Sequence, residues 1–200
     1  MTKSTNPSFD FFVLYRKFMK DIKTGRRVQP NGKRLSSGTQ NNYYFTALLL
    51  EKFCKQKSFE LRIKPIRRMN KRELKLENNY WKKFYKSFTD YLYNDLGYFD
   101  NYVGHAIKNI RSFFGFLNKD LGLNVGEFYK FMYVRKEEIP IFPLMPEELN
   151  FLISDKKFEA TLTPRMKELK DFFVFGCTVA LRFSDLIRLQ KSNIREVNEN

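Results

Sequence analysis

The sequence predicts an all-α protein. Apolar residues recur at helical spacing in several long segments, strand-like alternation is sparse, and capping or turn residues separate the segments. The chain has 200 residues, of which 42% are hydrophobic and 17% aromatic, so it can build a substantial core. No apolar stretch approaches the length that crosses a membrane, and the first residues lack the apolar block of a signal peptide.

The first expected helix covers residues 8–23, and a basic loop follows it. The apolar set of this helix follows the i, i+3, i+4, i+7 pattern, and Thr24-Gly25 provides its C-terminal stop. The loop 26–34 contains four basic residues, no acidic residue and a Pro-Asn-Gly turn. We expect Lys33 and Arg34 in this loop to contact nucleic-acid phosphates.

The second expected helix begins near residues 37–39, where a hydroxyl can cap it. We expect it to present one apolar face, made of Phe45, Leu48, Leu49 and Phe53. The following residues 56–72 are basic and irregular. Three further candidate DNA contacts lie in this segment, namely Arg67, Arg68 and Lys71.

The third expected helix, residues 74–94, carries an aromatic stripe interleaved with lysines. Trp81, Phe84, Tyr85, Phe88, Tyr91 and Leu92 keep helical spacing for more than three turns. Aromatic rings among lysines can form a base-stacking platform. The regular spacing favours the alternative, in which the rings belong to the core and the lysines face solvent.

The fourth expected helix, residues 101–119, has the most regular apolar face. Asn101, Lys108, Arg111 and Asn118 lie off that face. A helix with a basic, amide-bearing side suits the major groove of DNA. Lys108 and Arg111 are therefore candidate DNA contacts.

Two prolines and a change of composition predict a domain boundary after the fourth helix. We expect an N-terminal domain over residues 1–134, a linker over 135–143 and a second domain over 144–200. The second domain begins with Pro146 at a first helical position, followed by a helix over 165–181 and a short one over 184–190. We expect the apolar run 172–181 to be fully buried, and Leu186 and Leu189 to face inward.

The net charge of +15 is the strongest overall signal for function. Such an excess attracts polyanions, and double-stranded DNA is the expected partner. The basic residues are spread along the chain rather than gathered on one amphipathic helix, so we expect no membrane partner. Cys54 and Cys177 are expected to be buried thiols of a cytoplasmic protein. The single histidine, His105, indicates no metal site, and we expect no cofactor.

Arg182 follows the apolar run directly and precedes Ser184 and Asp185. Arginine is rarely buried without a partner. In one interpretation the guanidinium of Arg182 binds a phosphate. Asp185 then holds the guanidinium in place, and Ser184 caps the short helix. In the other, Arg182 is a partly exposed arginine that pairs with Asp185.

This motif resembles the first catalytic-arginine motif of tyrosine recombinases, the phage integrase family. The matching residues are Val179-Ala180-Leu181-Arg182-Phe183-Ser184-Asp185-Leu186, with Ala180 where the family usually has glycine. The run 144–149, LMPEEL, is similar to the opening helix of the family's catalytic domain. Residues 35–123 resemble its helical SAM-like core-binding domain. The overall sequence pattern is similar to that of integrases of Bacteroidetes mobile elements.

The resemblance implies an enzyme that cuts and rejoins DNA through a 3′-phosphotyrosyl intermediate, with four protomers acting together on DNA. Arg182 would be the first catalytic arginine and Asp185 its acidic neighbour. The family's His-x-x-Arg motif does not occur, and the last tyrosine is Tyr133. We therefore expect the chain to be an N-terminal portion of a longer recombinase. This portion is expected to bind DNA but not to cleave it alone.

Two other functions stay open from the sequence. One is a complete, non-enzymatic, basic helical DNA-binding or regulatory protein of a mobile element. The other is an RNA-binding or interaction protein that uses its aromatic stripes as the partner surface.

Overall fold

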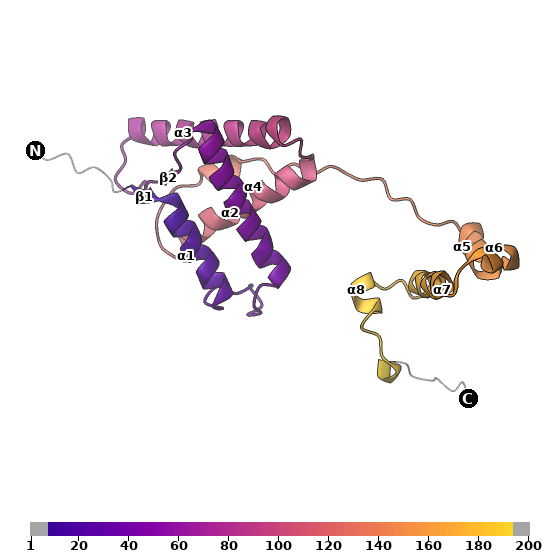
Figure 1. Cartoon of the computed structure of the whole chain (residues 1–200). Coiled ribbons are helices and arrows are strands. Elements are labelled where there is room, and N and C mark those ends of the chain that lie inside the picture. Colours follow the sequence, from indigo (N-terminus) through magenta and orange to yellow (C-terminus); the bar gives the residue numbers. More distant parts are fainter. Residues whose placement is uncertain (1–7, 194–200) are drawn as a thin grey trace, which may run out of the picture. The chain divides into compact units, whose positions relative to one another are not determined.

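The computed structural model describes residues 8–193 and divides the chain into two units, Met1–Glu138 and Ile139–Asn200 (Figure 1). The division falls inside the segment expected to be a linker. The described residues are mostly helical and contain one two-stranded sheet, so the fold class is all-α. Among these residues, no helix combines the length and apolar character needed to span a membrane.

Unit 1 is a bundle of four long helices with a small antiparallel sheet at one end. The sheet pairs Phe9 with Ile63 and Asp10 with Arg62. A π-helix extends the third long helix, and a short 3-10 helix, η2, follows the fourth. The elements in chain order are β1 Phe9–Asp10, α1 Phe11–Lys23, α2 Ser37–Lys57, β2 Arg62–Ile63, α3 Lys71–Asp90, the π-helix Tyr91–Asp95, α4 Asp100–Lys119 and η2 Phe128–Phe131.

Side-chain caps fix where three of these helices begin. The Asp10 carboxylate accepts a hydrogen bond from the backbone N–H of Val13 at 2.7 Å, so α1 starts at residue 11 and not at 8. Ser36 caps α2. A reciprocal capping box between Asn70 and Glu73 starts α3 at residue 71, three residues before the expected start.

The core of unit 1 is dominated by aromatic rings from α1, α3 and α4. The expected apolar face of the fourth helix is confirmed. All seven of its residues are buried, namely Val103, Ala106, Ile107, Ile110, Phe113, Phe114 and Leu117. In the third helix, five of the six stripe residues are buried and Tyr85 is partly buried, so the core interpretation is confirmed. Most of the aromatic stripe of α3 therefore belongs to the core of unit 1.

The expected apolar face of α2 is partly wrong. Phe45 is 54% exposed, whereas Leu49 and Phe53 are buried. The buried side chains begin instead at Tyr43, whose hydroxyl meets the Ser112 hydroxyl of α4 at 3.0 Å. A helix that turns residue 43 inward also turns residues 46, 47, 50 and 53 inward, and it places residue 45 about 200° around the axis from residue 43, on the opposite side.

A buried carboxylate joins the small sheet to α3. Glu77 is 4% exposed and accepts two hydrogen bonds from the Arg62 guanidinium, at 2.8 and 3.1 Å. The indole N–H of Trp81 donates to the same carboxylate at 3.0 Å. The Arg62 guanidinium also lies 4.2 Å from the ring centroid of Tyr80. This network satisfies a charge that would otherwise be costly to bury.

The described part of unit 2 consists of one 16-residue helix and several short ones, with little buried surface. Leu186 is the one buried residue in its described part, and it packs so closely on Gly176 that a Cβ there would lie 2.8 Å from the leucine. The helices are α5 Pro146–Ser154, α6 Lys156–Thr161, α7 Pro164–Val179, α8 Phe183–Leu186 and the 3-10 helix Lys191–Asn193. Pro146 begins α5 as expected, with two acidic residues in its first turn.

The expectation that residues 172–181 are fully buried is wrong. Phe173 is 50% exposed, Phe175 46% and Leu181 41%. Leu189, expected to face inward, is 39% exposed. An apolar run is buried only where other elements cover it, and in the described part of unit 2 the short helices α5, α6 and α8 leave much of α7 uncovered.

The two cysteines have different environments and should react at different rates. Cys54 is half-buried, and burial is the main cause that raises the pKa of its thiol to about 11. Cys177 is exposed, so the expectation of two buried thiols is wrong for this residue of α7. At pH 8 we expect iodoacetamide to alkylate Cys177 at least about tenfold faster than Cys54, because the thiolate is the reactive form. Peptide mass spectrometry over time measures both rates, and equal rates would contradict this assignment.

Candidate nucleic-acid interface

The net positive charge of the chain lies in its first part. Residues 1–138 contain 28 lysines and arginines and 13 acidic residues, whereas residues 139–200 contain nine of each. Unit 1 therefore carries the whole net charge of +15, and unit 2 is neutral overall. A polyanion would be attracted to unit 1.

The exposed side of α3 carries the most regular basic surface of unit 1. Lys71, Lys75, Lys82 and Lys86 are all exposed and follow one another at intervals of four, seven and four residues. At 3.6 residues per turn this spacing places them within a sector of about 60° along about 22 Å of helix. We call these four residues the lysine stripe.

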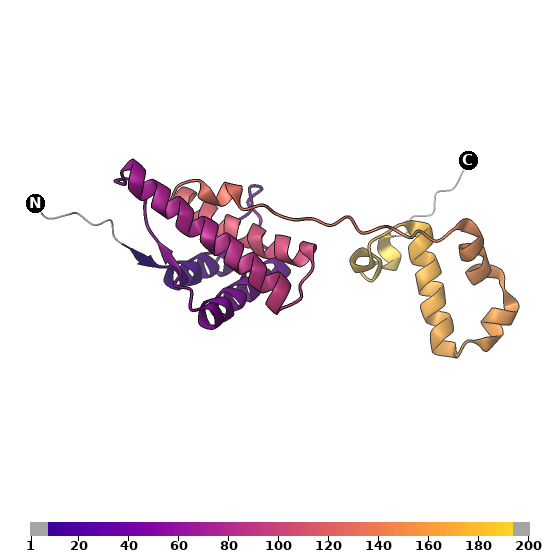
Figure 2. The ribbon, with the colours of Figure 1, turned by 90° about the horizontal axis from the view of Figure 1, so that it is seen from above.

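The lysine stripe forms no ion pair within the described part of unit 1. Figure 2 shows α3 in front of the other long helices of this unit. None of the four lysines forms an ion pair with another residue of 8–193. From Asn78 to Thr89 the helix has no acidic residue, and Glu77 is buried against Arg62. Arg72 and Lys83 extend the basic surface along its flank.

The candidate contacts in the two basic loops are exposed but lie far apart. Lys33 and Arg34 belong to the loop between α1 and α2, at the end of that helix pair away from α3 (Figure 1). Arg67 and Arg68 precede α3 and continue the basic surface that begins at Lys71. The helix α2 has 21 residues and is therefore about 30 Å long. Lys33 and Arg34 are separated from the basic surface of α3 by about 30 Å, the length of this helix.

The polar side of α4 is largely occupied by the chain itself. The Asn101 side chain exchanges two hydrogen bonds with the backbone of Glu137, at 3.0 and 3.2 Å. The Asn118 side chain bonds the backbone of Val125 and Gly126 in the same way. The Arg111 guanidinium donates to the Met132 carbonyl at 3.5 Å.

The segment 125–137 thus covers the face expected to enter a major groove, and that expectation is wrong for most of its residues. At Gly104 the segment approaches so closely that a Cβ would lie 2.0 Å from the Arg135 carbonyl oxygen. Of the two α4 candidates, Lys108 stays exposed and Arg111 is partly buried. The sequence pattern of α4 did not reveal this cover, because the covering residues carry no long helical periodicity of their own.

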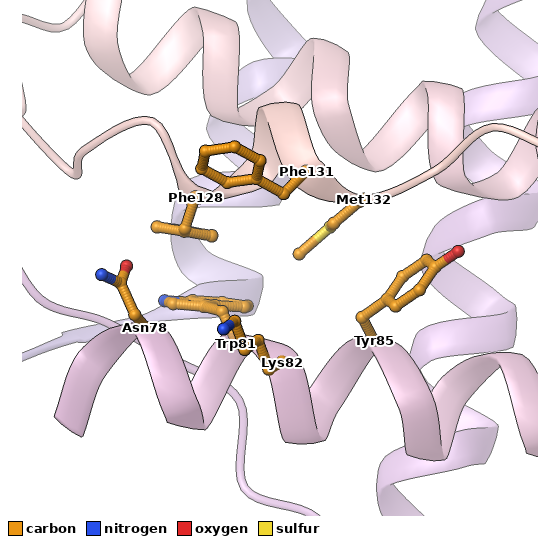
Figure 3. Close-up of a pocket in the computed structure, with 7 residues that line it drawn as sticks. All are labelled: Asn78, Trp81, Lys82, Tyr85, Phe128, Phe131 and Met132. Atoms are coloured by element: carbon orange, nitrogen blue, oxygen red, sulfur yellow. The ribbon is translucent and has the colours of Figure 1, made fainter. Parts of the chain in front are cut away.

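A groove of about 320 Å³ runs beside the lysine stripe, between α3 and the segment 128–132 (Figure 3). Trp81 and Phe128 form its floor at one end, with ring centroids 4.7 Å apart and ring planes 5° apart. Tyr85 lies toward the other end, where its hydroxyl donates to the Tyr133 carbonyl at 3.1 Å. Lys82 lines the groove and also belongs to the lysine stripe.

Arg182 and Asp185 are both exposed, and the structure forms no ion pair or hydrogen bond between their side chains. Arg182 is the N-cap of α8, and its carbonyl accepts from the N–H groups of Asp185 and Leu186. Ser184 lies inside the helix, so the expectation that it caps the helix is wrong. The helix also ends at Leu186 rather than at 190. A turn follows it, in which the N–H groups of Arg188 and Leu189 donate to the carbonyls of Asp185 and Leu186.

Ala180 adopts a left-handed conformation, with φ 51° and ψ 28°, at the C-terminus of α7. Glycine is the usual residue at such a position, and an L-residue there costs about 1 kcal/mol. The turn before Arg182 is therefore the one that a glycine would make, although the sequence has alanine.

Comparison with known proteins gave no relative for this chain. No protein-family model matches it, and neither a curated protein nor a solved structure matches it significantly. Its class rests on the fold and the surface alone: an all-α protein with one strongly basic unit. No group of three or more potential metal ligands occurs among residues 8–193.

The sequence pointed to the charge but missed its best-organised surface. The lysines of α3 were expected to face solvent, and only Lys71 was singled out as a contact. The stripe could have been found by plotting Lys75, Lys82 and Lys86 on a helical wheel, where they share one side. The groove could not have been found in this way, because residues 128–132 come from a segment without helical periodicity.

Proposed function

We propose that unit 1 binds nucleic acid by holding the sugar-phosphate backbone along the lysine stripe of α3. One observation carries this proposal: four lysines lie on one exposed side of α3 and form no ion pair within residues 8–193, on the unit that holds all the net charge. Phosphate contacts of this kind give affinity without reading sequence. Arg67, Arg68 and Lys108 add exposed charge to the same unit, and duplex DNA is the partner proposed for it.

The test of this proposal is the salt dependence of binding. The whole chain is titrated with a labelled 20-base-pair DNA duplex at several salt concentrations. We expect the association constant to fall steeply with salt, because each phosphate contact releases condensed counterions. A flat response would reject the proposal.

A second proposal is that the chain is the DNA-binding portion of a tyrosine recombinase with a SAM-like core-binding domain. The observation that favours it is the left-handed Ala180, which reproduces a glycine-type turn before Arg182. In this proposal the exposed Arg182 guanidinium contacts a backbone phosphate. Other recombinase protomers bind the DNA together with this chain. A non-enzymatic DNA-binding protein would need no such contact.

Arg182→Ala tests the role of this arginine. We expect the substitution to weaken duplex binding about fivefold to tenfold, because one charge-assisted phosphate contact is lost. Arg188→Ala is the matched control, since it removes an exposed arginine six residues away in the same unit. Fluorescence anisotropy with a labelled duplex measures both variants. Equal affinities for the two variants would contradict the contact.

A further inference from the structure

The side chain of Phe131 is largely exposed and contributes little to the core of unit 1. It is 83% exposed, whereas its neighbours Phe128 and Met132 on the same segment are 9% and 3% exposed. No aromatic ring among residues 8–193 packs against it at stacking distance. Its ring lies at the opening of the groove, above Phe128 (Figure 3).

The opposite wall of the groove offers polar groups that the protein does not use. The Asn78 side chain makes no hydrogen bond within the described residues and lines the groove from α3. One helical turn further along, Lys82 is exposed and forms no ion pair within residues 8–193. The groove therefore combines an aromatic and apolar interior with one amide and one ammonium at its rim.

We propose that this groove receives a single unpaired nucleobase of a nucleic acid bound along the lysine stripe. The base would stack on Phe131, its edge would meet the Asn78 amide, and the adjoining phosphate would meet Lys82. Stacking on aromatic residues beside a positively charged track is how proteins hold single strands. The inference rests on the proposed function, because the lysine stripe supplies the charge that brings the strand to the groove.

The charge of the surroundings selects this occupant over an apolar peptide. The groove is bordered by the lysine stripe, whose positive charges lie along most of α3 and can pair with phosphates. Its volume of about 320 Å³ lies at the lower end of the range for small-ligand pockets and suits one planar ring system. Bases inside a duplex have their faces covered by their neighbours, so only an unpaired base can place its face against Phe131.

Trp81 makes the inference directly measurable. It is the one tryptophan of the chain and lies in the floor of the groove. The whole chain is titrated with a 12-nucleotide oligothymidylate, with an abasic strand of the same length and with a duplex. We expect the emission of Trp81 to change on binding of oligothymidylate but not of the abasic strand or the duplex. We also expect the abasic strand to bind at least about fivefold more weakly than oligothymidylate.

Phe131→Ala tests the stacking wall. We expect it to lower the affinity for oligothymidylate about 5- to 150-fold and to leave the affinity for the abasic strand unchanged. Phe131→Tyr should restore binding, because a phenol ring stacks as well. Phe99→Ala is the matched control, since Phe99 is another phenylalanine of unit 1 and is 78% exposed.

The outcomes separate the two proposals. Equal, salt-dependent binding of both strands without a change in Trp81 emission would overturn the base-binding groove and leave the phosphate-binding stripe intact. Loss of salt-dependent binding to every nucleic acid would overturn both, and the groove would then be open to a protein partner instead. Circular dichroism of Phe131→Ala establishes that the fold is intact, so a loss of affinity is not a loss of folding.

Discussion

Replacing the four residues of the lysine stripe by glutamine is expected to reduce nucleic-acid binding more than any other surface change. The quadruple variant, Lys71→Gln, Lys75→Gln, Lys82→Gln and Lys86→Gln, should lower the affinity at 50 mM salt at least about 100-fold. The slope of log K against log salt should become shallower by about 3 to 4, since each phosphate contact contributes about 0.9. Affinities for a DNA duplex at four or more salt concentrations give both quantities.

The control for this variant removes the same charge from the neutral unit. Lys156→Gln, Lys157→Gln, Arg165→Gln and Lys167→Gln lower the net charge of the chain by four, as the stripe variant does. If binding depends on the arrangement of charge on α3, the control keeps its slope and its affinity within about threefold. If both variants lose affinity equally, binding follows the overall charge, and the lysine stripe is not the site.

Glu77→Ala is expected to give the largest loss of stability of any single substitution at the α3–β2 junction. The substitution leaves the Arg62 guanidinium and the Trp81 N–H without their shared acceptor. Removing one member of a buried charge pair costs about 3 to 5 kcal/mol. Because Arg62 is 25% exposed and can regain some water, we expect about 3 kcal/mol, or a fall in Tm of about 10 °C.

Urea unfolding followed by circular dichroism measures this effect, and Trp81 emission reports on unit 1 separately. Glu51→Ala is the matched control, since Glu51 is an exposed glutamate of α2, and it should change the free energy of unfolding by less than about 0.5 kcal/mol. The pair Arg62→Met and Glu77→Leu should recover much of the loss, because it leaves no unpaired charge. A Glu77→Ala variant as stable as the control would show that the network contributes little.

The positions of the long helices could be predicted from the sequence because their periodicity is a local property. The apolar residues of α4 and the aromatic stripe of α3 each repeat over several turns, and that spacing alone identifies the buried side. Boundaries were less accurate where a side-chain cap decided them, as Asn70 and Glu73 do for α3. The apolar face of α2 was partly misassigned, because Tyr43 and Phe45 are both aromatic and the contacts of Tyr43 with Phe18 and Ser112 decide which of them faces inward.

The sequence by itself determined the helical class of this protein and its excess of positive charge. The tertiary structure decided which parts of that charge remain available. It covered the polar side of α4 with residues 125–137, left the lysine stripe of α3 open, and placed Phe131 beside it. It also left the apolar residues of α7 exposed. The physical reason is that charge and periodicity are carried by individual segments, whereas access to a surface depends on which distant segment packs over it.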